Sequence, residues 1–186
     1  MRSVNGWKQA VVAVIAFAGW VTGAQAALEI GDKVADFVLP SAEGGKEGRF
    51  RLSEMLARGP VVLYFFPAAF SEGCSLEAHA FAEAVGEFTA AGASVVGISA
   101  DDIDVLKTFS VKACQSKFPV LADPKMDVIR AFDAGMRSRP EYASRITYVI
   151  STDGVILHQY TSLNPGGHVA RALAVVRARA RLPVSR

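Results

Sequence analysis

The sequence predicts an α/β fold, with a central mixed β-sheet flanked by helices on both faces. Short runs of β-branched and aromatic residues alternate along the chain with segments whose apolar residues recur at helical spacing. Late in the chain, two apolar runs surround an Asp-Gly pair, which is typical of an antiparallel hairpin. Together these patterns predict a sheet that contains both parallel and antiparallel strands.

The middle of the chain reads strand, helix, strand, helix, strand. We expect the strands at residues 60–66 ("PVVLYFF"), 93–99 and 118–123. The first helix ends where Gly92 is placed as a C-terminal cap, and the second begins at Asp102. Strands connected through helices in this way are parallel. The apolar positions at helical spacing are Leu76, Ala80, Phe81, Ala84, Val85 and Phe88 in the first helix, and Ile103, Leu106, Phe109 and Ala113 in the second.

Shorter elements lie on either side of this region. The Asp153-Gly154 pair forms the expected hairpin turn. The remaining expected elements are two short pieces at 36–40 and 49–53, a brief helix at 128–132, strands at 145–150 and 155–160, and a final helix at about 167–179.

The first 26 residues have the features of a signal peptide. Arg2 and Lys8 precede an apolar run at 10–20, and the small-residue pattern Ala24-Gln25-Ala26 follows. We expect cleavage after Ala26, which leaves residues 27–186 as one domain that is periplasmic or secreted and has no stable membrane association. An uncleaved membrane anchor is the alternative, although the run is diluted by Ala and Gly and a spanning helix needs about 20 firmly apolar residues.

The charge of the chain gives little indication of a partner. The predicted signal peptide holds two of the 20 Lys and Arg residues and none of the 18 Asp and Glu residues, so residues 27–186 carry equal numbers of both signs. A late group of arginines recurs on the predicted final helix and its tail, which is typical of a solvated helix face. We therefore expect no nucleic-acid partner.

The chain has two cysteines, Cys74 and Cys114. In an oxidising compartment such a pair is most often a structural disulfide, but one bridge adds little to a domain of this size. Ser71 is a good helix N-cap, so Cys74 falls in the first helical turn, where unpaired N–H groups and the helix dipole favour a thiolate. The alternative is a buried, inert cysteine, while the polar residues 71–73 favour a loop tip.

The stretch "PAAFSEGC" at residues 67–74 matches the Pro-x-x-x-(Thr/Ser)-x-x-Cys signature of the peroxiredoxins. The sequence resembles the PrxQ or bacterioferritin-comigratory-protein type within the AhpC/TSA, thioredoxin-like superfamily. Four further blocks of this sequence resemble segments of the family and follow one another in the same order. The resemblance covers nearly all of residues 28–180. These blocks are "GDKVADFVLP", "VVGISADDIDVLKTF", "FPVLADP" and "SRITYVISTDGVI".

This resemblance implies a thioredoxin-like fold and a role for each matching residue. Cys74 corresponds to the peroxidatic cysteine, whose thiolate attacks peroxide and becomes a sulfenic acid. Ser71, backbone N–H groups and Arg145 would stabilise the departing oxygen, and Pro67 would shape and shield the pocket. From the residues alone, the favoured interpretation of Arg145 is an ordinary surface arginine at a strand end. Pro67 can equally be a strand terminator, and it can have both roles. Glu77 matches an acidic position of the family and has a supporting role.

Many relatives place a resolving cysteine five residues after the first, where this chain has His79. Some relatives carry that cysteine on the next helix, which is where Cys114 falls. A helical wheel puts Cys114 at the reachable edge of the apolar face. We therefore expect a transient Cys74–Cys114 disulfide, with a single-cysteine mechanism as the alternative. His79 could be a base or a metal ligand, but a packed or half-exposed histidine is the favoured interpretation. His158 and His168 form no metal-ligand spacing with the cysteines, and no cofactor or metal is expected.

The resulting hypothesis is an exported thiol peroxidase that reduces hydrogen peroxide or organic hydroperoxides. A thioredoxin-like or other thiol reductant would regenerate it, and we expect a monomer or a weak homodimer. A disulfide oxidoreductase on the same fold is an alternative, disfavoured because the chain has no Cys-x-x-Cys. A metal-carrying or redox-sensing binding protein that uses Cys74, His79 and Cys114 is a third hypothesis from another class.

Overall fold

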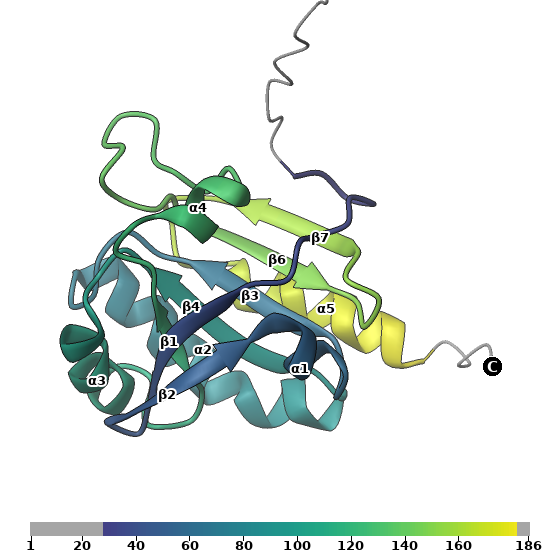
Figure 1. The fold of residues 1–186 in the computed structure, drawn as a ribbon. Helices are drawn as coiled ribbons and strands as arrows, with labels where there is room; N and C mark the ends of the chain where they lie inside the picture. The colour runs from purple at the N-terminus through teal and green to yellow at the C-terminus, as the bar shows by residue number, and fades with distance from the viewer. Residues whose placement is uncertain (1–27, 182–186) are drawn as a thin grey trace, which may run out of the picture.

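The computed structural model describes residues 28–181, in which seven strands form a single sheet of order β2-β1-β5-β4-β3-β6-β7 (Figure 1). The predicted signal peptide lies outside the described residues. The strands are β1 (Val38–Glu43), β2 (Lys46–Arg51), β3 (Val61–Phe65), β4 (Ser94–Ser99), β5 (Val120–Ala122), β6 (Ile146–Ile150) and β7 (Ile156–Thr161). The helices are α1 (Leu52–Leu56), α2 (Glu72–Ala90), α3 (Ile103–Lys112), α4 (Asp127–Ala131) and α5 (His168–Ala180).

The sheet is mixed, as the sequence predicts. Strands β3, β4 and β5 are parallel to one another, because helices α2 and α3 make the connections between them. Strand β6 runs antiparallel to β3, and β7 runs antiparallel to β6 across the Asp-Gly turn. In this turn Gly154 takes a φ of 80°, and its N–H donates to the carbonyl of Ser151 at 2.9 Å.

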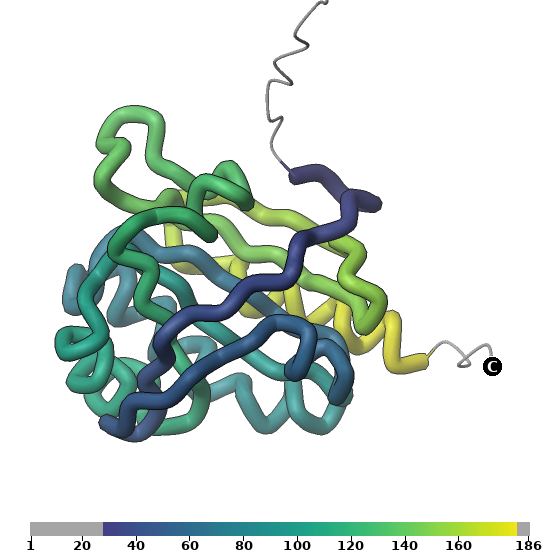
Figure 2. Tube along the Cα trace, in the orientation of Figure 1, coloured from purple at the N-terminus to yellow at the C-terminus, as the bar shows by residue number. Residues whose placement is uncertain are grey.

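The two short pieces expected before the first strand form more structure than their sequence indicates. They belong to a β1–β2 hairpin, and β1 also pairs antiparallel with β5 (Figure 2). The second piece runs directly into α1, a helix that the sequence patterns do not predict. Helix α1 has only five residues, which is too short to show a helical periodicity.

Helices cover both faces of the sheet. Alternate residues of β3 point to opposite sides: Val62 and Tyr64 pack among α2, α3 and α5, whereas Val61, Leu63 and Phe65 pack with α1 and α4. All five of these β3 side chains are fully buried, so β3 is the centre of two apolar cores.

The buried face of helix α2 agrees only in part with the apolar pattern. Phe81, Ala84 and Phe88 are buried as predicted, whereas Leu76 is 57% exposed and Ala80 is also exposed, so the predicted place of these two is wrong. In the first turns the buried positions are Cys74 and Glu77, which recur with Phe81 at intervals of three and four residues. A buried carboxylate breaks the apolar pattern, which is why the sequence did not indicate this face.

Within residues 28–181, no helix combines the length and the apolar character needed to cross a membrane.

Candidate active site

Cys74 lies just after the turn that joins the end of β3 to the start of α2. The N–H of Phe66 donates to the carbonyl of Ile98 at 3.0 Å, after which the half-buried Pro67 starts a turn. The N–H of Ala69 donates to Oδ2 of Asp101 at 2.7 Å, so a side chain two positions after the end of β4 fixes this turn. The turn therefore delivers the chain to the start of α2 in a defined position.

Cys74 is in the first turn of α2 and is only 1% exposed. The expectation that it occupies an exposed loop tip is wrong, because this turn of the helix packs onto the core. The first helical hydrogen bond joins the N–H of Ser75 to the carbonyl of Ser71 at 2.9 Å. The N–H groups of Gly73 and Cys74 precede that bond and are free of the helical ladder, so they can bind negative charge.

Arg145 is directed at the sulfur of Cys74. In the antiparallel register of β3 and β6, Ile146 lies opposite Phe65, which places Arg145 beside the end of β3. Nη2 of Arg145 donates to Sγ of Cys74 at 3.4 Å, and the guanidinium is buried. Because a cation that hydrogen-bonds to a sulfur favours its ionised form, this contact supports a thiolate.

Three further acceptors hold the guanidinium in place. Nε donates to the carbonyl of Leu163 at 3.0 Å, and Nη1 donates to the carbonyl of Gly73 at 3.3 Å and to Oε2 of Glu77. A Cβ on Gly73 would lie 3.0 Å from Nη2, so a glycine lets the guanidinium approach the helix this closely. The position of Arg145 is thus fixed from several sides.

Glu77 is fully buried and forms an ion pair with Arg145 through Oε2. Its other oxygen, Oε1, has no hydrogen-bond partner within the described residues. Burial raises the pKa of Glu77 to about 7, although Arg145 opposes the shift. The sequence indicated only a supporting acidic residue near a helix N-terminus, whereas the structure shows a buried carboxyl that shares its cation with Cys74.

His168, the first residue of α5, completes this buried group. Nδ1 of His168 lies 2.8 Å from Oγ1 of Thr147 and 3.5 Å from Oε1 of Glu77, and Nε2 lies 3.0 Å from the carbonyl of Ser162. Burial lowers the pKa of His168. Sequence reasoning considered His168 only as a metal ligand and missed this contact, because no local pattern connects it with Glu77.

Ser71 and Pro67 flank the turn before Cys74. Ser71 is at the N-cap position in an extended conformation, but its side chain makes no capping hydrogen bond. Its exposed Oγ instead donates to the carbonyl of Ala68 at 3.0 Å. Ser71 is therefore close to Cys74 in the chain, with its hydroxyl turned to the loop backbone.

Cys114 follows the end of α3 and is fully buried, so its predicted position at a reachable helix edge is wrong. The chain leaves the helix at Ala113, and both Gln115 and Ser116 adopt left-handed φ values, 52° and 58°. With this change in the direction of the backbone, Cys114 lies in the same apolar core as Cys74.

The two cysteines are free, but their surroundings differ. Burial raises the pKa of the Cys114 thiol to about 12, and the neighbouring Tyr64 hydroxyl opposes this shift only in part. Tyr64 stacks on Phe81 with ring centroids 4.5 Å apart. Cys114 is therefore a protonated thiol near neutral pH, and it would need a new environment before it could react as a thiolate.

Residues 28–181 contain no group of three or more His, Cys, Asp and Glu side chains that could hold a metal ion. His79 instead contacts Gln115, with its Nδ1 2.9 Å from Nε2 of the amide. A hollow of about 270 Å³ lies beside the site, between the first turns of α2 and the end of α3. Its lining residues are Phe70, Ser75, Leu76, His79, Lys112 and Ala113.

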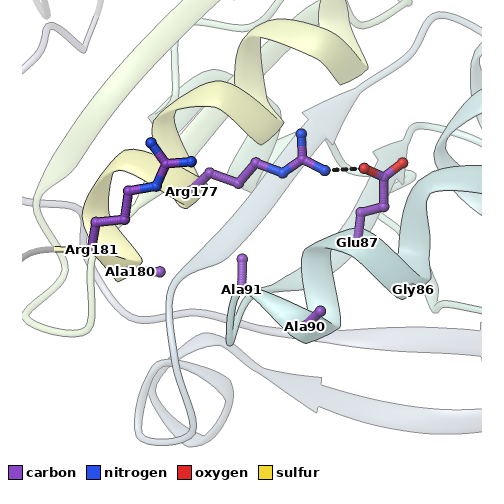
Figure 3. A pocket seen from close by; sticks show the side chains of 7 residues that line it. All are labelled: Gly86, Glu87, Ala90, Ala91, Arg177, Ala180 and Arg181. Carbon is purple, nitrogen blue, oxygen red and sulfur yellow. Dashed lines mark hydrogen bonds and ion pairs between the residues drawn. The ribbon is translucent and has the colours of Figure 1, made fainter.

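A second hollow, of about 420 Å³, lies at the other end of α2, where Arg177 of α5 pairs with Glu87 (Figure 3). Twelve residues of helix, a rise of about 18 Å, separate Cys74 from Gly86 at this hollow. The Arg177–Glu87 pair ties α5 to α2 and takes no part in the reactive centre.

We predict that Glu77 makes folding stability fall as pH rises. The unfolded carboxyl loses its proton around its ordinary pKa of 4.5, whereas the folded one keeps it until about pH 7. Between these values the folded state binds more protons, so the free energy of unfolding falls by roughly 3 kcal/mol over this window. Glu77→Gln should flatten this dependence in urea unfolding measured from pH 4.5 to 8. Parallel pH profiles for the wild type and the variant would contradict the prediction.

The chain matches the AhpC/TSA family over residues 30–159. It is 37% identical over 154 residues to "Putative peroxiredoxin Rv1608c" of Mycobacterium tuberculosis, a match that covers 81% of this chain and 97% of the relative. It is 29% identical to peroxiredoxin Bcp of Xanthomonas campestris, covering 79% and 93% of the two chains.

Solved structures agree with this match. The crystal structure of peroxidoxin BcpB from Mycobacterium tuberculosis superposes with a TM-score of 0.74 at 36% identity, covering 81% of this chain and 97% of that one. A PrxQ mutant from Xylella fastidiosa, 24% identical, has the same fold with a TM-score of 0.74, covering 83% and 98% of the two chains. The fold is thus the expected thioredoxin-like one. The chain belongs to the AhpC/TSA family and is a peroxiredoxin, that is, a thiol peroxidase.

Proposed function

We propose that this peroxiredoxin reduces hydrogen peroxide or small organic hydroperoxides with Cys74 as the attacking thiolate. The contact that carries this proposal is the hydrogen bond from Nη2 of Arg145 to Sγ of Cys74, 3.4 Å long and buried. Cys74 is also in the first turn of a 19-residue helix, where the N–H groups add to the positive field. Both features favour an ionised sulfur, which is the nucleophilic form.

In the reaction, the thiolate attacks one peroxide oxygen, a sulfur–oxygen bond forms and the oxygen–oxygen bond breaks. Cys74 becomes a sulfenic acid, and the departing hydroxide or alkoxide takes up a proton. Negative charge passes from the sulfur to that oxygen, so donors already aimed at the sulfur stabilise the transition state. We assign this role to Arg145 and to the N–H groups of Gly73 and Cys74. Ser71 would join them by rotating its hydroxyl away from Ala68, and Pro67 would shield the pocket.

We predict that Arg145→Lys slows the oxidation of Cys74 by hydrogen peroxide by about 10² to 10³-fold. Lysine keeps the charge but cannot contact Cys74, Glu77, Gly73 and Leu163 at once, and losing a preset donor has an effect of this size. The measurement is the second-order rate constant from rapid mixing with peroxide. Arg177→Lys, in the surface pair with Glu87, is the matched control and should react like the wild type. Equal rates for all three proteins would rule out a role for Arg145.

We further propose that Cys114 resolves the sulfenic acid as a transient disulfide with Cys74. Both cysteines lie in one apolar cluster, and both are free. Left-handed backbone conformations occur beside each of them, at Phe70 before Cys74 and at Gln115 and Ser116 after Cys114. Such residues cost about 1–3 kcal/mol each, which lowers the additional cost of unwinding these segments. Unwinding would also expose the Cys114 thiol to water, where it ionises more readily.

We predict that one equivalent of peroxide removes two hydrogens from the mass of the reduced wild type, because a disulfide forms. Cys114→Ser should instead gain one oxygen at Cys74, since no second thiol remains to condense with the sulfenic acid. Mass spectrometry of both proteins after quenching with a thiol-blocking reagent measures this difference. The added oxygen in both proteins would indicate the single-cysteine mechanism.

The reducing partner is proposed to be a thioredoxin-like or other thiol protein. Such a partner attacks the disulfide, or the sulfenic acid, through its own thiolate. A monomeric or weakly dimeric state, and the lack of nucleic-acid and stable membrane association, stay predictions from the sequence.

We also propose that the protein acts after export to the periplasm or the outside of the cell. Support comes from the sequence of residues 1–26, with its basic start, apolar run and Ala24-Gln25-Ala26 motif. We predict that the mature protein from a secreting bacterial host begins at Ala27, as measured by amino-terminal sequencing. Replacing Ala24 and Ala26 with bulky residues should block processing. A chain that keeps residues 1–26 in the membrane fraction would indicate the anchor instead.

A further inference from the structure

The contact between Glu77 and His168 requires a proton. The positions of the heavy atoms alone do not show which of the two side chains carries it. Oε1 of Glu77 has no hydrogen-bond partner within the described residues and lies 3.5 Å from Nδ1 of His168. Both side chains are fully buried and therefore lie away from bulk solvent. A buried polar atom of this kind is costly unless it is bonded.

The other contacts of His168 determine where hydrogens can lie. The carbonyl of Ser162 can only accept, so Nε2 of His168, 3.0 Å away, must carry a hydrogen. Nδ1 of a neutral ring is then a lone pair. If Glu77 were ionised beside a neutral His168, two acceptors would face each other at 3.5 Å. One proton between Oε1 and Nδ1 removes this conflict, and Nδ1 then divides its single lone pair or hydrogen between Glu77 and the hydroxyl of Thr147, which can donate or accept.

The charges around the pair give that proton a function. Arg145 supplies one positive charge and contacts both Cys74 and Glu77, each of which can be negative. While Cys74 is a thiolate, a proton on the pair keeps the group neutral. Once Cys74 is an uncharged sulfenic acid, Arg145 is balanced by an ionised Glu77, and the extra proton becomes unfavourable.

We propose that Glu77 and His168 share one proton while Cys74 is a thiolate and release it when peroxide consumes the charge of that thiolate. The step balances: the thiolate gives two electrons to the peroxide, the leaving hydroxide or alkoxide takes up one proton, and the pair loses one. His168 is then a positioning residue, which acts on Cys74 through Glu77 and Arg145. This inference rests on the proposed peroxidase reaction of Cys74.

The groups that face the pair come from every element packed around it. They are Cys74 on α2, Tyr64 on β3, Arg145 and Thr147 at β6, Tyr160 on β7 and Arg171 on α5. The Tyr160 ring packs edge-on against His168 and also contacts the Arg171 guanidinium, which keeps that charge on the outer side of the ring. Of these groups, Cys74 is the one whose charge the reaction changes.

The test is a titration of the reduced protein by NMR, with ¹³C-labelled glutamate carboxyls and ¹⁵N-labelled histidine rings. In the wild type, the Glu77 carboxyl and Nδ1 of His168 should titrate in one joint step. Cys74→Ser, which removes the negative charge, should lower the midpoint of that step by about 1 pH unit. Equal midpoints in the two proteins, or separate midpoints for the two side chains, would overturn the proposal.

Two variants of histidine serve as a matched pair. His168→Gln keeps an amide that can donate to Ser162 and removes Nδ1, so Glu77 loses the partner of its proton and its midpoint should fall. His158→Gln, on β7, should leave the Glu77 midpoint in place, and a shift as large as that of His168→Gln would count against the pairing.

If His168→Gln fails to fold, the comparison of the wild type with Cys74→Ser still decides. Fast oxidation by peroxide with unchanged midpoints would reject this inference alone, whereas a Cys74 that does not react with peroxide would reject the proposed function.

Discussion

The guanidinium of Arg145, shared between the sulfur of Cys74 and the carboxyl of Glu77, is the interaction on which the site depends. Burying these groups has a large desolvation cost, which is offset because each nitrogen of the guanidinium has at least one acceptor. The β3–β6 register brings Arg145 to the start of α2, and Gly73 leaves room for it. The sheet and the first helical turn therefore define one electrostatic site between them.

The same arginine explains why two cysteines in one apolar cluster differ chemically. Cys74 and Cys114 are both almost fully buried, and burial by itself favours the neutral thiol of each. Cys74 also faces a cation and the free N–H groups of a helix start, whereas the polar neighbour of Cys114 is the uncharged hydroxyl of Tyr64. Burial in this protein hence keeps the Cys114 thiol protonated as long as the fold is intact, and it strengthens the field of Arg145 at Cys74, since a low dielectric increases both effects.

The site also joins segments that the proposed disulfide would require to move with segments that would stay in place. Arg145 directly precedes strand β6, and Glu77 is in the long helix α2, so regular secondary structure holds both. The turn before α2 and the chain after α3 contain left-handed residues, and Phe109 of α3 packs against both Phe66 and Phe70 of that turn. Unwinding at either cysteine would thus disturb the packing at the other. The guanidinium of Arg145 would stay in place for the next cycle of the proposed reaction.

The sequence by itself determined the order of strands and helices from β3 onward, the mixed sheet, the family and the place of Cys74 in a first helical turn, because these follow from local periodicity, turn residues and a contiguous motif. Only the tertiary structure decided which charges meet. The burial of Cys74 and Cys114, the exposed Leu76 and the contact between Glu77 and His168 depend on how α2, α5 and β6 pack. Residues from separate elements that meet only in the folded chain leave no local pattern in the sequence, so the contacts between their charges appear only once the fold has brought them together.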